Sequence, residues 1–108
     1  MTNTVLEFAK ITLAPTASEA DLLAASATFE AEFLTKQDGF IRRDLVRTGD
    51  GTYADVILWE SREKADAVFA AAQTSPAADG YFEMMHMDPD ADPGDIVAHY
   101  AVLRSVAA

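Results

Sequence analysis

The sequence predicts an α+β fold in which strands and helices follow the order β-α-β-β-α-β and the strands form one antiparallel sheet. Stretches rich in β-branched and aromatic residues alternate with stretches whose apolar residues recur at helical spacing. An Asp-Gly turn joins the two middle strands directly, which is typical of an antiparallel hairpin. The length of 108 residues suits one domain, so we expect residues 1–108 to fold as a unit.

The first strand is expected from Val5 to Leu13, where β-branched and aromatic residues precede a stop at Pro15. A helix then begins after an N-cap at Ser18 and ends at Gly39. Acidic residues in its first turn favour the positive end of the helix dipole. Its apolar residues recur at roughly helical spacing, at Leu22, Leu23, Phe29, Phe33 and Leu34.

The middle of the chain predicts a hairpin that leads into a second helix. Strands are expected at Phe40 to Arg47 and Thr52 to Trp59, and the turn Thr48 to Gly51 carries the Asp-Gly signature. The second helix begins after an N-cap near Ser61 and runs through an alanine-rich stretch to about Ala72.

The last third of the chain predicts one short helix and one strand. Proline suits a first helical turn, so a short helix is expected from Pro76 to Met85. Asp88 to Asp95 is expected to be a loop, and Ile96 to Leu103 is the last strand. Together the elements predict a ferredoxin-like plait, an antiparallel sheet with helices on one face.

The uncovered face of this sheet predicts a partner. Its strands are so apolar that a monomer would expose a larger patch than folded monomers usually tolerate. Two-fold packing of two such sheets would bury the patch. We therefore expect a homodimer through the open sheet face.

The charge and composition of the chain exclude several classes of partner. The formal net charge is −10, which argues against nucleic acid and against an anionic membrane surface. The chain has no cysteine, which excludes disulfides, thiolate nucleophiles and sulfur-ligated metals. The N-terminal sequence lacks a secretory pattern and no apolar run approaches membrane-spanning length, so we expect a cytoplasmic protein.

The acidic loop does not predict a metal site. An EF-hand loop needs glycine at its sixth position and glutamate at its twelfth. Counted from Asp88, those positions hold Pro93 and His99. The glycines near Asp50 also lack the spacing of a phosphate-binding or dinucleotide-binding loop. We therefore expect neither a metal nor a cofactor.

Three motifs give the chain a resemblance to a known family. They are Trp59-Glu60-Ser61 followed by Arg62 to Ala65, Gly39-Phe40 before the second strand, and Ser75 to Met85 followed by His99-Tyr100. In these motifs the chain resembles the antibiotic-biosynthesis-monooxygenase-like group of the dimeric α/β-barrel superfamily. The resemblance covers nearly the whole chain, and implies the ferredoxin-like fold and a dimeric α/β barrel.

The resemblance implies several kinds of chemistry. Characterised members of this group include cofactor-independent oxygenases of aromatic polyketides, haem-degrading enzymes and proteins that only bind ligands. The oxygenases and haem degraders are associated with an asparagine and a tryptophan in the pocket. This chain has one asparagine, Asn3, and one tryptophan, Trp59. The aromatic spacing around His86 does not match the helical histidine that binds haem iron in the haem degraders.

Strand alternation sorts the polar side chains by face, since every second residue points the same way. Glu7 lies with the apolar residues of the first strand, and His99 with those of the last. The third strand places four residues on one face, namely Tyr53, Asp55, Ile57 and Trp59. The second strand has two alternating sets, Phe40, Arg42, Asp44, Val46 and Ile41, Arg43, Leu45, Arg47. If the polar faces coincide, Glu7, Asp55, His99 and an arginine converge.

Two interpretations of this polar group stay open. Asp55 and His99 could be catalytic, because a carboxylate near a histidine in a low-dielectric cavity suits proton transfer. Alternatively, Asp55 and Glu7 could pair with Arg42 or Arg43 and hold the sheet or the dimer together.

The sequence favours a pocket for a small, largely apolar or aromatic ligand in each subunit, because apolar residues mixed with a few polar groups are typical of such sites. The expected ligand-binding residues are Trp59, Tyr53, Phe82, Met85, Arg42 and Arg43. Two alternatives remain: a cofactor-independent monooxygenase acting on an aromatic or polyketide-like substrate, and a structural dimer without a ligand.

Overall fold

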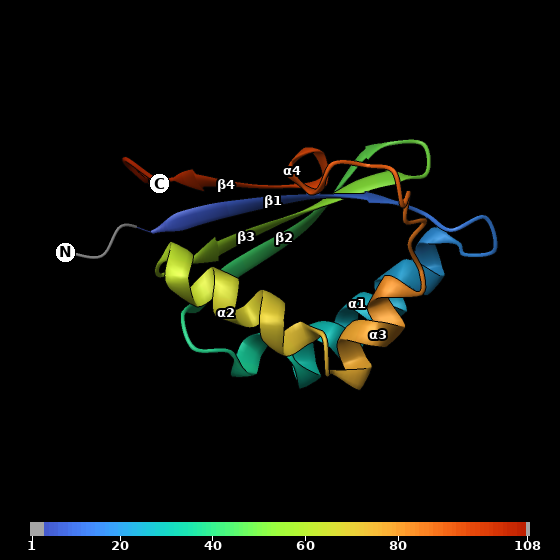
Figure 1. The fold of residues 1–108 in the computed structure, drawn as a ribbon, viewed down its shortest axis with the longest axis horizontal. Helices are drawn as coiled ribbons and strands as arrows, with labels where there is room; N and C mark the ends of the chain where they lie inside the picture. The colour runs from blue at the N-terminus through green and yellow to red at the C-terminus, as the bar shows by residue number, and fades with distance from the viewer. Residues whose placement is uncertain (1–3, 108) are drawn as a thin grey trace.

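The computed structural model describes residues 4–107 of the chain, and within this range four strands form one antiparallel sheet in the order β2-β3-β1-β4. Helices α1, α2 and α3 all cover the same face of that sheet (Figure 1). The elements are β1 (Val5–Thr12), α1 (Glu19–Glu32), η1 (Leu34–Lys36), β2 (Phe40–Gly49), β3 (Thr52–Trp59), α2 (Arg62–Ala72), α3 (Pro76–Phe82), α4 (Pro93–Ile96) and β4 (Val97–Ala101). The predicted ferredoxin-like plait is confirmed.

Helix α1 begins as the sequence predicts and ends earlier. The Ser18 side chain accepts a hydrogen bond from the Asp21 backbone at 3.2 Å, and Asp21 accepts one from the Ser18 backbone at 2.9 Å. These reciprocal bonds form a capping box. The helix ends at Glu32, and the 3₁₀ turn η1 follows before Gly39. The prediction of one continuous helix up to Gly39 was therefore wrong for the residues after Glu32.

Gly39 is needed where η1 leads into β2. Its φ is +91°, in the left-handed region that favours glycine. A Cβ on this residue would lie 2.5 Å from Cδ and 2.8 Å from Cβ of Lys64 in α2. The Gly39 carbonyl also accepts a 2.8 Å hydrogen bond from the Glu60 backbone. Gly39 thus lets the start of β2 approach the start of α2.

The last third of the chain differs from the prediction in three places, and one of them is the last strand, which is β4 (Val97–Ala101) instead of Ile96 to Leu103. Helix α3 ends at Phe82 instead of Met85, because Met85 pairs with Leu13 in an isolated bridge and the His86 backbone donates to the Thr12 carbonyl at 2.8 Å. The expected loop ends in a single helical turn, α4. Among residues 4–107 no helix has the length and apolar character to cross a membrane.

The strand register confirms part of the predicted face assignment and corrects the rest. Val5 faces Trp59 across the β1–β3 ladder, and Glu7 faces both Ile57 in β3 and His99 in β4. The predicted sets for the second strand agree with the register from Arg42 to Arg47, and were wrong at Phe40. Phe40 pairs with Trp59 and Arg42 with the next residue, Leu58, so Ile41 forms a bulge. This extra residue puts Phe40 on the same face as Arg43 and leaves Arg42 on the opposite face.

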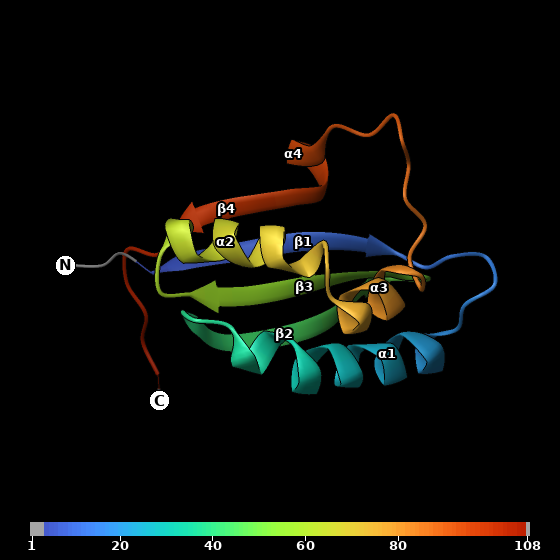
Figure 2. The same cartoon turned by 60° about the horizontal axis from the view of Figure 1, so that its bottom comes forward.

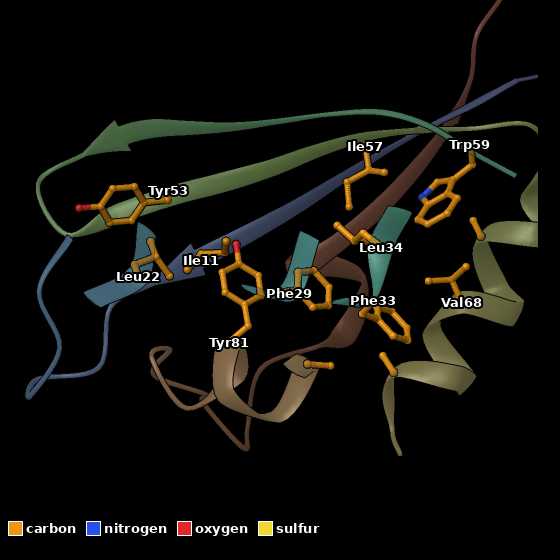
Figure 3. Packing of buried hydrophobic residues seen from close by; sticks show 13 residues of the cluster. Ile11, Leu22, Phe29, Phe33, Leu34, Tyr53, Ile57, Trp59, Val68 and Tyr81 are labelled. Carbon is orange, nitrogen blue, oxygen red and sulfur yellow. The ribbon is translucent and has the colours of Figure 1, made fainter. Parts of the chain in front are cut away.

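The core lies between the sheet and the three helices. Figure 3 shows Trp59 and Ile57 pointing from β3 toward Leu34 and Val68. Trp59 meets Phe40 edge to face, with ring centroids 5.8 Å apart. The buried apolar cluster consists of Ile11, Leu22, Phe29, Phe33, Leu34, Tyr53, Ile57, Trp59, Ala65, Val68, Ala72, Ala78 and Tyr81.

Candidate functional site

A buried ion pair between Arg43 and Asp55 joins the sheet to two helices. Arg43 Nε donates to Asp55 Oδ1 at 2.9 Å, and Nη2 lies 2.8 Å from the same oxygen. Arg43 Nη1 donates to the Ser26 hydroxyl of α1 at 2.7 Å. The Tyr81 hydroxyl of α3 accepts from Arg43 Nη2 at 2.8 Å and donates to Asp55 Oδ2 at 2.8 Å. We call these four residues, Ser26, Arg43, Asp55 and Tyr81, the buried polar cluster.

Two aromatic rings complete the surroundings of Arg43. Its guanidinium carbon lies 5.6 Å from the ring centre of Phe29 and 5.2 Å from that of Tyr81. The two rings stack on each other at 4.8 Å, and Figure 3 shows them side by side. A guanidinium at this distance from aromatic faces gains a cation–π attraction. Arg43 is therefore held by charge, hydrogen bonds and aromatic contact together.

Burial changes the acid–base properties of this cluster. It raises the pKa of Asp55 above the ordinary value, while the Arg43 guanidinium and the Tyr81 hydrogen bond oppose the rise. Burial, followed by the Asp55 charge, also raises the pKa of the Tyr81 hydroxyl. Tyr81 therefore remains a neutral donor. Both Asp55 oxygens accept hydrogen bonds, and through them the carboxylate links β3 to β2 and α3. A catalytic role of Asp55 stays a prediction.

The structure separates the two arginines of the predicted site. The Arg43 side chain is only 3% exposed, whereas that of Arg42 is 68% exposed. Arg42 lies on the open face of the sheet and pairs with Asp44 at 2.8 Å. Pairing of Asp55 with Arg43 agrees with the structural interpretation of the sequence. Arg42 does not reach that cluster.

The predicted aromatic and methionine residues lie in or against the core. Tyr53 donates its hydroxyl proton to Glu19 at 2.9 Å, near the hairpin end of the sheet. Trp59 is fully buried, and its Nε1 has no hydrogen-bond partner among the described residues. Phe82 and Met85 pack against the core from its edge. Whether any of these four residues contacts a ligand stays a prediction.

A second polar pair, Glu7 and His99, lies on the helix-covered face of the sheet near its β4 edge. His99 Nε2 lies 3.1 Å from Glu7 Oε1, and the side chains are 14% and 18% exposed. Figure 2 shows β4 beside α2 rather than beneath it, so none of α1, α2 and α3 covers this edge. The predicted convergence of Glu7, Asp55, His99 and an arginine divides into two groups, because His99 faces Glu7 whereas Asp55 faces Ala9 on the strand between them.

Sequence reasoning missed Ser26, the hydroxyl of Tyr81, and Phe69. Ser26 gave a usable signal, because it lies between Leu22 and Phe29 on the buried stripe of α1, where a polar residue needs a partner. Phe69 is 67% exposed on α2. Helical spacing places it on the flank away from Lys64, which packs on Gly39 at the β2 side, and therefore on the flank toward β4.

Two open hollows of about 410 Å³ each mark the surface of the described chain. One lies between α1 and the turn that follows α3, and is lined by residues that include Asp21, Ala25 and Met84. The other lies on the open face of the sheet, lined by residues that include Leu6, Val56 and Tyr100. Within residues 4–107, no three histidine or carboxylate side chains cluster closely enough to hold a metal ion. Asn3 lies outside the described residues.

The fold is shared with several solved structures. SnoaB from Streptomyces nogalater, a cofactor-independent oxygenase, superimposes with a TM-score of 0.72 and 17% identity over 96% of this chain and 97% of that chain. An antibiotic-biosynthesis-monooxygenase-type protein from Bordetella bronchiseptica gives 0.73 and 21% identity over 94% and 99%. The haem-degrading protein Rv3592 from Mycobacterium tuberculosis, in its haem-free form, gives 0.60 and 19% identity over 100% of both chains.

These superpositions define the class of fold. The chain has the ferredoxin-like fold of the antibiotic-biosynthesis-monooxygenase-like proteins, and the resemblance that the sequence indicates is confirmed at the level of the fold. No protein-family model matches the sequence, and no curated protein sequence matches it either.

Proposed function

We propose that this chain forms a homodimer in which each subunit binds a small, largely apolar ligand beside Glu7 and His99. The observation that carries the proposal is the partial exposure of this hydrogen-bonded pair, at 18% and 14% of the side chains. Asp55, in contrast, is buried with both oxygens occupied. A polar pair at the edge of an apolar layer can orient a ligand whose remaining surface is apolar.

The neighbourhood of the pair supports an apolar or aromatic ligand. Phe69 is exposed, and helical spacing puts it on the flank of α2 opposite Lys64, toward β4. Val97 and Ala101, which alternate with His99 on β4, add apolar surface on the same face. A flat ligand between this strand and Phe69 would stack on the ring and exchange one hydrogen bond with the histidine.

The second histidine of the chain gives a matched control for a binding test. We would measure the affinity for 2-naphthol, an aromatic ring with one hydroxyl, for the wild type, His99→Asn and His86→Asn. His86 is exposed in the loop after α3. Loss of one hydrogen bond costs about 1 kcal/mol, so His99→Asn should weaken binding about fivefold, with His86→Asn unchanged. Equal affinities in both variants, or no binding by the wild type, would reject the site.

A second candidate function is proton abstraction, as in a cofactor-independent monooxygenase. Glu7 favours it, because a carboxylate that accepts from Nε2–H holds the imidazole in the tautomer whose acceptor is Nδ1. This base would take a proton from a reduced aromatic substrate before oxygen reacts with it. Oxygen consumption with an anthrone should then fall in both His99→Asn and Glu7→Gln. A wild type that consumes no oxygen with such compounds would exclude this candidate.

The homodimer is proposed from the uncovered face of the sheet. Leu6, Val56 and Leu58 lie there, and Tyr100 is 58% exposed. No element of the described chain covers this face in the way that α1 to α3 cover the other (Figure 1). Face-to-face packing about a two-fold axis would bury these side chains. Light scattering during size-exclusion chromatography should give twice the chain mass of 11.6 kDa, and a monomer across a dilution series would reject the dimer.

A further inference from the structure

The C-terminal segment from Val102 to Ala107 carries the two most exposed large apolar side chains of the described chain. Leu103 is 96% exposed and Val106 is 78% exposed. The segment has no helix or strand, and it is attached to the sheet by a 2.9 Å hydrogen bond from the Val102 backbone to the Thr4 carbonyl. Exposed apolar side chains that lie close together on one segment can mark a contact with another protein surface. We call residues 102–107 the C-terminal arm.

The arm runs over the open face of the sheet. Figure 2 shows it leaving the end of β4 and passing toward the β2 edge. Val102 and Ser105 form one wall of the hollow on that face, together with Arg42 and Asp44 of β2. The floor of the hollow is apolar, with Leu6, Val56 and Leu58 from the two central strands. The arm therefore borders an apolar hollow of about 410 Å³ while its own Leu103 and Val106 point away from the chain.

The charge of the arm indicates what it meets. Residues 96–108 contain one arginine, Arg104, and no carboxylate. The preceding 95 residues hold the other seven lysines and arginines and all 18 carboxylates, which gives 7 − 18 = −11. The one charged side chain of the apolar arm, Arg104, is opposite in sign to the strongly acidic body of a second copy of the same chain. Asp44, at the rim of the hollow and half exposed, is a carboxylate that Arg104 of another copy could approach.

We propose that each arm seats Leu103 and Val106 in the open-face hollow of a second copy of this chain, so that the two arms cross the dimer interface reciprocally. A two-fold axis makes the exchange self-consistent, since each copy both donates an arm and receives one. The inference rests on the proposed homodimer and adds to it which segment contributes and where it docks. It predicts that the arm, and not only the flat sheet, determines dimer affinity.

Cross-linking between two variants tests the exchange directly. The chain has no cysteine, so a single introduced thiol reports without background. An untagged Leu103→Cys chain and a tagged Val56→Cys chain would be mixed, allowed to exchange subunits, and treated with a short bismaleimide. The expected product is a covalent heterodimer. The matched control replaces Leu103→Cys by Leu23→Cys, an exposed apolar position on α1 at the helix side of the sheet, and should give no heterodimer.

The outcomes separate this inference from the proposed dimer. A dimer by light scattering that gives no more cross-link than the Leu23 control would overturn the exchanged arm and leave the dimer standing. A monomer at every concentration would overturn both. As a second measurement, Leu103→Asp and Val106→Asp should each raise the dimer dissociation constant about tenfold, which corresponds to about 1.4 kcal/mol. Leu23→Asp should leave it unchanged, and equal dissociation constants for all three variants would also overturn the arm.

Discussion

Arg43 and Asp55 form a buried ion pair at 2.8 Å, with side chains 3% and 7% exposed. Such a pair is costly to break, because removal of one partner leaves an uncompensated charge in a medium that solvates it poorly. The neighbouring Arg42 has an equally short contact with Asp44, but in water. Two consecutive arginines therefore have very different expected effects on stability.

Replacement of Arg43 by methionine should strongly destabilise the fold. We expect Arg43→Met to lower the free energy of unfolding by about 3–5 kcal/mol, since it strands the Asp55 carboxylate and removes the partner of Ser26. Arg42→Met is the matched control and should cost less than about 1 kcal/mol, as exposed pairs do. Urea unfolding monitored by the fluorescence of Trp59 measures the free energy of unfolding of both variants. Equal losses in the two variants would contradict the buried role of Arg43.

Sequence reasoning predicted two members of the buried polar cluster, Arg43 and Asp55, but not the hydrogen bonds that join them to Ser26 and Tyr81. It left open whether Asp55 pairs with Arg42 or Arg43, because strand alternation does not show which residue of the second strand lies opposite Asp55; in the structure that residue is Leu45, which shares a face with Arg43. The bulge at Ile41 reverses the alternation only before Arg42, so it misplaced Phe40 and not the arginines. Tyr81 reaches Asp55 from a helix far along the chain, and such a contact depends on how α3 packs.

The Glu7–His99 pair was more predictable. Both residues lie on regular strands without a bulge between them, so counting every second residue grouped each with the correct neighbours on its strand, although it did not show which face of the sheet the helices cover. What the sequence could not show is that β1 puts Glu7, and not Asp55, opposite His99. Register is fixed by the whole ladder and by the hairpin turn rather than by any one residue.

Removal of the Tyr81 hydroxyl should destabilise the protein more at neutral than at acid pH. Tyr81→Phe keeps the ring against Phe29 but removes the donor to Asp55 Oδ2, which costs about 1–3 kcal/mol while that carboxylate is ionised. The hydrogen bond from Tyr81 lowers the pKa of Asp55, so its loss raises that pKa further. An Asp55 pKa that is higher in the folded than in the unfolded state lowers the free energy of unfolding once Asp55 must ionise. This loss is absent below the unfolded-state pKa, and it grows as the pH rises through the folded-state pKa.

The measurement is urea unfolding of Tyr81→Phe and wild type between pH 3 and pH 7. We expect the difference in unfolding free energy to be largest at pH 7 and to shrink toward pH 3. Thr28→Val, which removes an exposed hydroxyl on α1, is the control and should differ little from wild type throughout. A difference for Tyr81→Phe that does not vary with pH would show that the hydroxyl does not act on the Asp55 charge.

Alanine should have opposite effects at two glycines. Gly39→Ala forces a side chain into a φ of +91° and against Lys64, and we expect a loss of about 1–3 kcal/mol. Gly80 lies within α3, and a Cβ there would meet no atom within 4 Å. Gly80→Ala should therefore stabilise the protein by about 0.5–1 kcal/mol through helix propensity. Thermal unfolding followed by circular dichroism should show a lower melting temperature for Gly39→Ala and a higher one for Gly80→Ala. Stabilisation by Gly39→Ala would contradict the close approach of β2 and α2.

Glu19 should contribute stability that is lost in acid. Its carboxylate accepts two hydrogen bonds from Arg47, both at 2.7 Å, and one from the Tyr53 hydroxyl at 2.9 Å. The bonds from Arg47, followed by the one from Tyr53, lower the pKa of Glu19 below the ordinary value of 4.5. A carboxylate with a lowered folded-state pKa stabilises the fold above its unfolded pKa, and this contribution disappears as pH falls through the folded value.

Glu19→Gln should therefore have a lower melting temperature than wild type at pH 7. We call this difference in melting temperature the margin, and it should narrow as the pH falls to 3. Glu32→Gln is the matched control, because Glu32 is exposed at the other end of the same helix, and its margin should stay small at both values. Added salt should also narrow the Glu19→Gln margin at pH 7, since the contact with Arg47 is at the surface. If the margin is the same at pH 3 and pH 7, the hairpin end is held by packing of Tyr53 rather than by the charge of Glu19.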